Sequence, residues 1–312
     1  MGPKLIYLVG LPGSGKSRYA ETWMLDHPDS IYISSDRIRG ELYGDENCQD
    51  DPGRVFDLMQ KRTLDALKEG KEVIYDATNV VRKNRIALLK NIPNAIVRGG
   101  YVEAVNKVCV VVWAKLEDCI NRDSFRDRHV GEKVIMKMAK RFQTPWYDEG
   151  WNEIQIYRDE LDCYHYDDFN LDIPHDNPHH PGTIQEHVQR VIHEVVRLKE
   201  HAGHEYNIST EDASVLLKVA MFHDIGKPLT KTFVNKKNET TEIAHYYDHQ
   251  NVSAYITLGS KFLSAQDDAL FVSYLVNMHM EPFFSESNYY KNMKMDIRRL
   301  VELFNECDRA GA

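Results

Sequence analysis

Two kinds of apolar spacing divide the chain. In the first half, short apolar runs alternate with segments whose apolar residues recur every three to four positions. Such runs are typical of buried parallel strands, and the periodic segments are typical of amphipathic helices. The pattern predicts an α/β domain with a mostly parallel sheet. The expected strands are Leu5–Gly10, Ile31–Ser34, Val73–Tyr75 and Val108–Trp113, and the expected helices are Lys16–Asp26, Arg54–Gly70, Leu116–Arg126 and Lys133–Phe142.

The second half has helical spacing from Thr183 onward and few β-branched runs, so we expect a second domain that is nearly all α. Between the halves, Asp159–Pro181 carries seven acidic residues and shows no clear period. We interpret it as a connection, which gives a first domain at 1–158, a linker at 159–180 and a second domain at 181–312. The expected helices of the second domain follow Thr183 and include Ala213–Phe222, Ser253–Leu263, Ala269–Met280 and Asp296–Arg309.

Composition fits a folded protein, with 42% hydrophobic and 28% charged residues in 312. The start, MGPKLIYLVG, lacks the features of an export leader, no apolar run is long enough for a membrane span, and five scattered cysteines suit a reducing compartment. We therefore expect a cytoplasmic protein. Residues 1–160 are neutral overall, whereas residues 161–312 carry the net charge of −9. An acidic second half argues against a general nucleic-acid platform there, because such binding depends on Lys and Arg.

A phosphate-binding motif lies between the first expected strand and the first expected helix. The segment GLPGSGKS fits G-x-x-x-x-G-K-[ST] in the context that this motif requires. Glycines allow backbone N–H groups to approach phosphate oxygens, and the helix N-terminus adds partial positive charge. Lys16 is expected to contact the outer phosphates, and Ser17 to bind Mg²⁺. The expected NTP-binding residues are Gly10, Gly13, Ser14, Gly15, Lys16 and Ser17.

Candidate acceptor residues follow the next strands. Asp36 and Arg39 come after the second strand, where a carboxylate could take a hydroxyl proton and an arginine could orient a phosphate. An N-cap aspartate with a surface arginine is an equally good interpretation. Asp76–Asn79 closes the third strand and fits either a metal and substrate contact or a simple turn. Arg122 and Arg126, four residues apart, fit a phosphate-covering lid or a solvated helix face.

These motifs, in order, resemble the phage-type 5′-polynucleotide kinases. GLPGSGKS, SSDRIRG, YDATNV and NRDSFRDR carry the resemblance, which spans about residues 4–145. It implies that Asp36 is the general base for a 5′-OH, that Arg39 contacts the 3′-phosphate of the acceptor nucleotide, and that Arg122 and Arg126 belong to the lid. Arg128 has no clear counterpart in that family.

The second half contains a histidine and aspartate set. His223 and Asp224 are adjacent at the end of an apolar helix, and Gly226 permits the helix to end there. His187 lies on the first expected helix of this half and Asp308 near the end of the last. Imidazole and carboxylate groups together suit a catalytic divalent transition metal. A His-Asp pair alone is a weak signal, and the complete set is stronger.

This set resembles the HD-domain phosphohydrolases, whose pattern H…HD…D corresponds to His187, His223-Asp224 and Asp308. The resemblance implies an all-α metal enzyme that uses Mn²⁺, Co²⁺, Ni²⁺ or Fe²⁺, with Lys227 contacting substrate phosphate. His249 and His279 stand where some members bind a second metal, although two structural histidines fit as well. His180 could face the cleft or belong to the linker.

Together the two resemblances imply an RNA or DNA end-healing enzyme. The first domain would phosphorylate 5′-OH ends from ATP or another NTP with Mg²⁺, RNA being favoured, and the second would remove a 3′-phosphate or 2′,3′-cyclic phosphate. A ligase is a possible partner, and no membrane association is expected. In the described fusions of these modules the HD module comes first, whereas here the order is reversed. Two alternatives stay open: a small-molecule or nucleoside kinase fused to a nucleotide phosphohydrolase, and a kinase with a nucleotide-sensing HD module. The sequence does not distinguish RNA from DNA, the metals or the oligomeric state.

Overall fold

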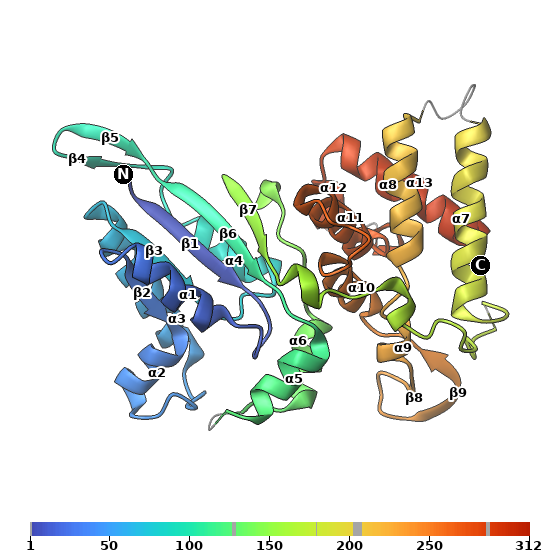
Figure 1. Ribbon diagram of the computed structural model, residues 1–312, viewed down its shortest axis with the longest axis horizontal. Helices are drawn as coiled ribbons and strands as arrows, with labels where there is room; N and C mark the ends of the chain where they lie inside the picture. The colour runs from blue at the N-terminus through green and yellow to red at the C-terminus, as the bar shows by residue number, and fades with distance from the viewer. Residues whose placement is uncertain (1, 127–128, 179, 202–207, 285–287) are drawn as a thin grey trace. The chain divides into compact units, whose positions relative to one another are not determined.

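The computed structural model describes residues 2–126, 129–178, 180–201, 208–284 and 288–312 (Figure 1). The chain forms two units, and it passes between them more than once. The first unit contains residues 1–138 and 145–163, and the second contains residues 139–144 and 164–312. Of the segment expected to be a linker, residues 159–163 therefore lie in the first unit and residues 164–180 in the second.

A five-stranded parallel sheet forms the centre of the first unit, in the order β2-β3-β1-β6-β7 (Figure 1). Five of the six residues of β1 are buried and so are six of the seven of β6, which explains the apolar runs at 5–9 and 108–112. The strands are β1 (Lys4–Val9), β2 (Ile31–Ser34), β3 (Glu72–Asp76), β6 (Asn106–Val112) and β7 (Glu153–Tyr157).

Six helices accompany this sheet, and α1 packs its Tyr19 and Ala20 against the strands. Because the strands are parallel, the turns after β1, β2 and β3 open at the same edge of the sheet. The helices are α1 (Lys16–Asp26), α2 (Ser35–Tyr43), α3 (Pro52–Lys68), α4 (Arg82–Leu89), α5 (Leu116–Ser124) and α6 (Glu132–Ala139). The predicted α/β domain with a parallel sheet is confirmed.

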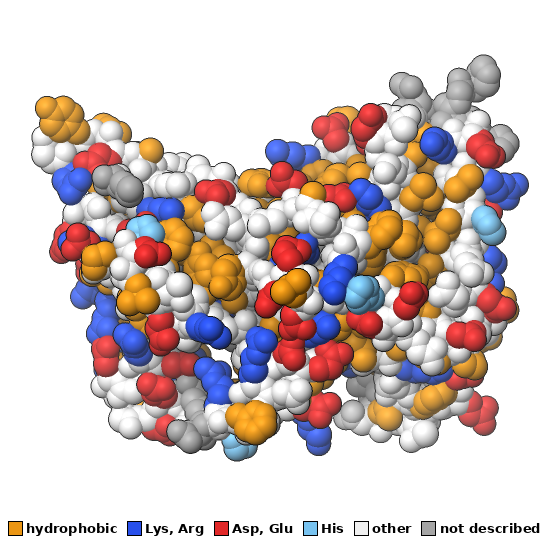
Figure 2. Space-filling model, in the orientation of Figure 1, with side chains coloured by type: hydrophobic (Ala, Val, Ile, Leu, Met, Phe, Trp, Pro, Cys, Tyr) orange, Lys and Arg blue, Asp and Glu red, His pale blue; other side chains and the backbone are white. Residues whose placement is uncertain are grey.

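Three features of the first unit were not expected from the sequence. The edge strand β7 has only two buried residues in five, so its apolar signal is weak. Helices α2 and α4 are short, and at least half of the residues of each are polar. The hairpin of β4 (Ala95–Arg98) and β5 (Tyr101–Ala104) turns through Gly99 and Gly100, both with positive φ. Figure 2 shows hydrophobic side chains gathered at the tip of this hairpin.

Helices make up most of the second unit, as predicted. Helix α7 packs on α8, and α10 packs on α11. An antiparallel hairpin, β8 (Thr232–Val234) and β9 (Thr240–His245), is the departure from an all-α domain. The helices are α7 (Ile184–His201), α8 (Thr210–Phe222), α9 (Lys227–Thr230), α10 (His249–Leu258), α11 (Gln266–Met278), α12 (Asn288–Lys291) and α13 (Met295–Ala310); the short 3₁₀ turns are Tyr147–Glu149, Glu160–Asp162, Tyr166–Asp168 and Glu281–Phe284.

Residues 139–144 pack within the second unit, although they directly follow α6. The ring of Phe142 is fully buried and meets Tyr255 edge to face at 5.2 Å. Thr144 Oγ1 lies 2.8 Å from Ser273 Oγ, and Asn277 Nδ2 donates to the Phe142 carbonyl. The helix expected at Lys133–Phe142 therefore ends at Ala139. In the described parts of the chain, no helix has the length and apolarity to cross a membrane.

Candidate active sites

The first candidate site is a cleft of about 400 Å³ at the carboxyl ends of β1, β2 and β3. Figure 2 shows the surface hollowed between α2 and the α5–α6 region, with Lys and Arg side chains on the rim. The cleft collects residues from distant parts of the first unit. They are Pro12, Lys16, Ser17, Ser34, Ser35, Asp36, Arg39, Glu46, Gln49, Phe56, Asp76, Ala77, Thr78, Arg126, Val130 and Met138.

The turn after β1 has the shape that the Gly-rich motif predicts. Gly13 and Gly15 have φ of 79° and 99°, and Gly15 is the N-cap of α1. A Cβ at Gly13 would collide with the backbone carbonyl of Cys119. A Cβ at Gly10 would lie 2.5 Å from the Val112 carbonyl oxygen. These glycines allow the turn to fit closely against β6 and α5, with the first N–H groups of α1 directed to where an anion can bind.

Lys16 and Ser17 start α1 at the edge of the cleft. The Nζ of Lys16 donates to the Leu11 carbonyl at 2.8 Å, and burial lowers the pKa of this amine below its usual 10.5. Ser17 Oγ donates to Asp76 Oδ2 at 3.2 Å, and Tyr32 OH donates to the same oxygen at 2.6 Å. A hydroxyl beside a buried carboxylate offers the hard oxygen atoms that suit Mg²⁺. Ser17 and Asp76 therefore fit the metal of a bound NTP.

Asp36 and Arg39 lie together on the first turns of α2. Arg39 Nη1 donates to Asp36 Oδ1 at 2.7 Å. The Arg39 side chain is 9% exposed, whereas that of Asp36 is 46% exposed. The buried guanidinium therefore holds an accessible carboxylate in the cleft that also contains Lys16. This arrangement goes beyond an N-cap aspartate with a surface arginine, since both residues line the cleft.

The sequence of Asp76–Asn79 fitted either a metal and substrate contact or a simple turn, and the segment contains features of both. Asp76 and Thr78 line the cleft. Asn79 instead turns back to the sheet: its φ is 54°, and its Nδ2 donates to the Leu8 carbonyl at 2.7 Å. Arg85 supports the same turn by donating to the Asn79 carbonyl oxygen at 3.2 Å.

The two arginines expected in the lid, Arg122 and Arg126, lie in different surroundings. Helix α5 ends at Ser124, so Arg126 lies beyond the helix and lines the cleft. Arg122 is not among the residues that line it; its Nη2 lies 3.9 Å from Asp118 and 4.0 Å from Asp162. The single helix face expected for the two arginines is therefore wrong. Arg128 lies outside the described residues.

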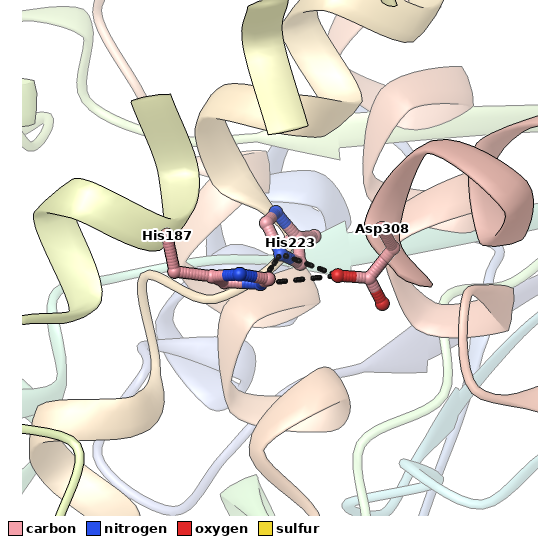
Figure 3. A group of neighbouring side chains, drawn as sticks. All are labelled: His187, His223 and Asp308. Carbon is pink, nitrogen blue, oxygen red and sulfur yellow. Dashed lines mark hydrogen bonds and ion pairs between the residues drawn. The ribbon is translucent and has the colours of Figure 1, made fainter. Parts of the chain in front are cut away.

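The second candidate site lies where α7, α8 and α13 meet. Figure 3 shows His187, His223 and Asp308 pointing toward one another from these helices and their ends. His187 Nε2 lies 3.1 Å from Asp308 Oδ1 and 3.3 Å from His223 Nε2, and His223 Nε2 lies 3.5 Å from the same Oδ1. One ligand atom from each residue can reach a common point. Two imidazoles and a carboxylate form a suitable divalent-metal set.

A second group of ligand atoms adjoins the first and consists of Asp224, His249 and His279. Asp224 connects the two groups. Its Oδ2 lies 3.3 Å from His223 Nε2 and 3.4 Å from His187 Nε2, while its Oδ1 lies 3.2 Å from His249 Nε2. One carboxylate thus presents one oxygen to each group, as a bridging ligand of two metals would.

Backbone carbonyls fix the orientation of all four imidazoles. The Nδ1 atoms of these rings lie 2.7 to 3.1 Å from the carbonyl oxygens of Gly311, Ala220, Tyr246 and Val276. A proton on Nδ1 leaves the Nε2 lone pair free to bind a metal, and such a second hydrogen bond is usual for metal-binding histidines. The rings are those of His187, His223, His249 and His279.

Strong electrostatic coupling accompanies this geometry. Burial opposes protonation of His223, but Asp224 and Asp308 outweigh burial and raise its pKa to about 10. Burial likewise opposes ionisation of Asp224, yet His223 and Lys227 hold its pKa well below 3.8. Burial lowers the pKa of His279 to about 3, so this imidazole is neutral. The carboxylate of Asp224 therefore stays ionised although it is buried, as a metal ligand must.

A cavity of about 430 Å³ gives access to this site. Lys227 lines it, with its Nζ 2.6 Å from Asp224 Oδ2, and so does His180. The ring of His180 stacks on His175 at 4.9 Å. His175 is fully buried, and both its ring nitrogens lack hydrogen-bond partners in the described structure. The remaining residues that line the cavity are Asp224, His249, His279, Met280, Phe283, Asp308, Arg309 and Ala312.

His175 was missed in the sequence because its segment has no helical or strand period. The only available signal was the density of histidines between Pro174 and Pro181. The histidines expected from the HD-like pattern were easier to find because they lie on or next to periodic helices.

Comparisons with known families give a separate match for each half of the chain. The model of an AAA domain matches residues 5–145, and the model of an HD domain matches residues 184–309. The protein therefore combines an N-terminal α/β P-loop domain with a C-terminal helical HD domain. The P-loop domain holds the cleft of Lys16 and Asp36, and the HD domain holds the histidine and aspartate site.

Individual relatives are distant. "Transcription factor bHLH140" of Arabidopsis thaliana is 29% identical over 169 residues, which are 51% of this chain and 16% of that protein. This chain thus spans about one sixth of the length of its curated relative. Among solved structures, one titled "Structure of Pnkp1/Rnl/Hen1 complex" is 24% identical, covers 39% of both chains and has a TM-score of 0.33. A fungal RNA kinase is 15% identical over 51% of this chain and 76% of its own, with a TM-score of 0.37. A gluconokinase from Sinorhizobium meliloti 1021 is 17% identical over 49% and 81%, with a TM-score of 0.34.

Proposed function

We propose that the P-loop domain is a 5′-hydroxyl polynucleotide kinase, with RNA as the favoured substrate. The observation that carries this proposal is the meeting of Lys16, Asp36, Arg39 and Arg126 in one cleft. NTP phosphates would bind the N–H groups of the Gly-rich turn and Lys16, with Mg²⁺ at Ser17 and Asp76. The acceptor hydroxyl would then approach from the side of Asp36.

In this mechanism, Asp36 accepts the proton of the acceptor's 5′-OH. The 5′-oxygen bonds to the γ-phosphorus, and the bond between that phosphorus and the β,γ-bridging oxygen breaks. Arg39 holds the carboxylate in place and, from its position in the cleft, would contact the acceptor's 3′-phosphate. Arg126 adds positive charge over the transferring group, where charge accumulates in the transition state. Arg122, paired with Asp118 and Asp162, would need to change partners to join it.

We propose that the HD domain is a metal-dependent phosphohydrolase that removes a 3′-phosphate or opens a 2′,3′-cyclic phosphate. His187, His223, Asp224 and Asp308 would hold one metal, and Asp224, His249 and His279 a second. Such metals supply Lewis acidity and an activated water. Lys227 would bind a phosphate oxygen from the cavity wall, and the backbone-bound imidazoles keep the site rigid.

The two activities complement each other chemically. A broken RNA strand with a 2′,3′-cyclic phosphate and a 5′-OH needs a change at both ends before a ligase can join it. One chain with both sites would prepare both ends, and a ligase is the partner that would consume its product. One solved structure with a likeness to this chain is titled as an RNA repair complex, which is consistent with such a partner.

The test uses the full chain with γ-labelled ATP and two acceptors, a 5′-OH RNA oligonucleotide and a mixture of nucleosides. Label in the oligonucleotide supports the proposal, whereas label found only in mononucleotides would favour a nucleoside kinase. In a second assay, RNA ending in a 3′-phosphate or 2′,3′-cyclic phosphate is incubated with Mn²⁺, Co²⁺, Ni²⁺, Fe²⁺ or Mg²⁺. Failure to hydrolyse either end with every metal would favour a nucleotide-sensing HD domain.

A further inference from the structure

One wall of the kinase cleft has no part in the mechanism above. Glu46, Gln49 and Phe56 line the same cleft as Asp36 and Arg39. Glu46 and Gln49 lie between α2 and α3, and Phe56 lies in the second turn of α3. Because Asp36 marks the acceptor side, this wall is where the body of an acceptor molecule would lie.

Phe56 is one of several large apolar side chains that the core leaves exposed, and it is one that lines this cleft. Helix α3 buries Val55 and Met59, while the neighbouring Phe56 is 40% exposed. In the described residues, the Phe56 ring has no aromatic neighbour in stacking contact. A flat apolar ring beside arginines and carboxylates is a suitable platform for another flat ring, since base-aromatic stacking is sequence-tolerant.

Glu46 and Gln49 add hydrogen-bonding groups to the same cleft. Both side chains are exposed, and neither takes part in a hydrogen bond or ion pair within the described part of the chain. A glutamine amide both donates and accepts, and a carboxylate accepts, so the pair can contact the polar edge of a heterocycle. A sugar acid or other small non-aromatic acceptor would leave the ring of Phe56 without a partner.

We propose that Phe56, Gln49 and Glu46 form a nucleobase subsite, in which the Phe56 ring stacks on the 5′-terminal base of the acceptor. This inference rests on the proposed kinase function and specifies its substrate class. Stacking on Phe56 orients the terminal nucleotide, Arg39 binds its 3′-phosphate, and the 5′-OH is directed to Asp36. The subsite therefore selects base-containing ends by their flat ring, with little preference among the four bases.

The experiment compares two 5′-OH oligonucleotides that differ only at the first nucleotide, which either carries its base or is abasic. For the natural protein, loss of the base is expected to lower kcat/KM by about 5- to 150-fold, the effect of one stacked base. Phe56→Ala should lower kcat/KM for the base-containing end by a similar factor, and should have little effect on the abasic end. If Phe56→Ala lowers kcat/KM for the abasic end by as large a factor as for the base-containing end, the two changes act independently and the proposal is overturned.

Further variants keep the result interpretable. Phe56→Leu preserves an apolar side chain without a flat ring and should behave like Phe56→Ala, whereas Phe56→Trp should restore the preference for the base. Phe233→Ala removes an equally exposed phenylalanine from β8 and should leave the kinase unchanged. ATP affinity should be the same in all of these proteins, which confirms that the Gly-rich turn is intact.

Binding separates failure of the subsite from failure of the proposed function. The same oligonucleotides, with 2-aminopurine as the terminal base, are titrated into protein saturated with a non-hydrolysable ATP analogue. Base-dependent binding that Phe56→Ala abolishes supports the subsite, even if no phosphate is transferred and the kinase proposal fails. Binding that ignores the terminal base overturns the subsite, even if the oligonucleotide is phosphorylated.

Discussion

Arg85 donates two hydrogen bonds to the carboxylate of Glu149, of 2.7 Å from Nε and 2.6 Å from Nη2, and neither side chain is exposed. Trp151 Nε1 donates to the same carboxylate at 3.0 Å. Since Arg85 also contacts the carbonyls of Asn79 and Val80, the pair fixes the turn that follows β3. This buried bidentate pair therefore supports the part of the cleft that the turn after β3 forms.

Glu149→Gln should destabilise the first unit strongly, because it leaves the Arg85 guanidinium buried without its counter-charge. The expected loss of unfolding free energy is about 3–5 kcal/mol, measured by urea denaturation. Glu41→Gln is the matched control, since its partner Arg62 is exposed and such pairs contribute little. Equal effects of the two variants would contradict the structural importance of the buried pair.

Asp36→Asn should abolish proton acceptance while preserving the shape of the side chain. We expect kcat for 5′-OH phosphorylation to fall by about 10²–10⁴-fold, with ATP affinity unchanged. Asp65→Asn on the exposed face of α3 should have no effect. A comparable loss of ATP binding would show that Asp36 serves the donor side of the cleft instead.

Arg126 and Arg122 should differ in importance. Arg126→Ala removes a cation from the cleft and should lower kcat by about 10²–10³-fold. Arg122→Ala breaks only long, exposed ion pairs with Asp118 and Asp162, so a change of a few-fold is expected. Steady-state kinetics with saturating ATP measures both. If Arg122→Ala is the more damaging variant, Arg122 must leave its carboxylate partners when substrate binds.

Metal content should respond in steps to changes in the HD site. His279→Ala should remove only the metal that the second group would hold. Asp224→Asn should weaken the binding of both metals, because the Asp224 carboxylate reaches both groups. Elemental analysis after dialysis against Mn²⁺ gives the metal-to-protein ratio. His193→Ala on the exposed side of α7 is the control and should keep the natural ratio. An unchanged ratio in Asp224→Asn would contradict the bridging arrangement.

Alkaline pH should destabilise the first unit through its buried tyrosines. Burial is the main cause that raises the pKa of Tyr19 to about 12, from 10.0 for the exposed group. Above pH 10 the unfolded state therefore releases this proton first, and the free energy of unfolding falls as pH rises toward 12. Tyr19→Phe should show a shallower decline of the free energy of unfolding, measured in urea, between about pH 10 and about pH 12. An identical slope would contradict the assigned cause.

Much of the fold was accessible from the sequence because its signals are local. The Gly-rich turn needs only glycines, Lys16 and Ser17 in a short segment, and the core strands β1 and β6 are almost uninterrupted apolar runs. The HD-like set was also found, because helical periodicity placed His187 and His223. The edge strand β7 and the β4–β5 hairpin escaped because few of their residues are buried.

The remainder depends on contacts that the sequence does not encode locally. Helix α5 ends at Ser124, and Asp123 accepts hydrogen bonds from the distant N–H groups of Val130 and Gly131, so Arg126 does not continue the helix that carries Arg122. His175 reaches the HD site from a segment without any period. The two oxygens of Asp224 serve different ligand groups only because α8, α10 and α11 converge.

The winding of the chain between its two units has a practical result for anyone who wishes to study either activity alone. A gene fragment that stops at residue 158 would contain Phe142 and Thr144 but not Tyr255 and Ser273, which meet them. Its product would expose an aromatic residue that is fully buried in the whole molecule, and should be prone to self-association. The reciprocal fragment would leave an unfilled space beside Tyr255. Inactivating one site by point substitution in the intact polypeptide is therefore the sounder dissection.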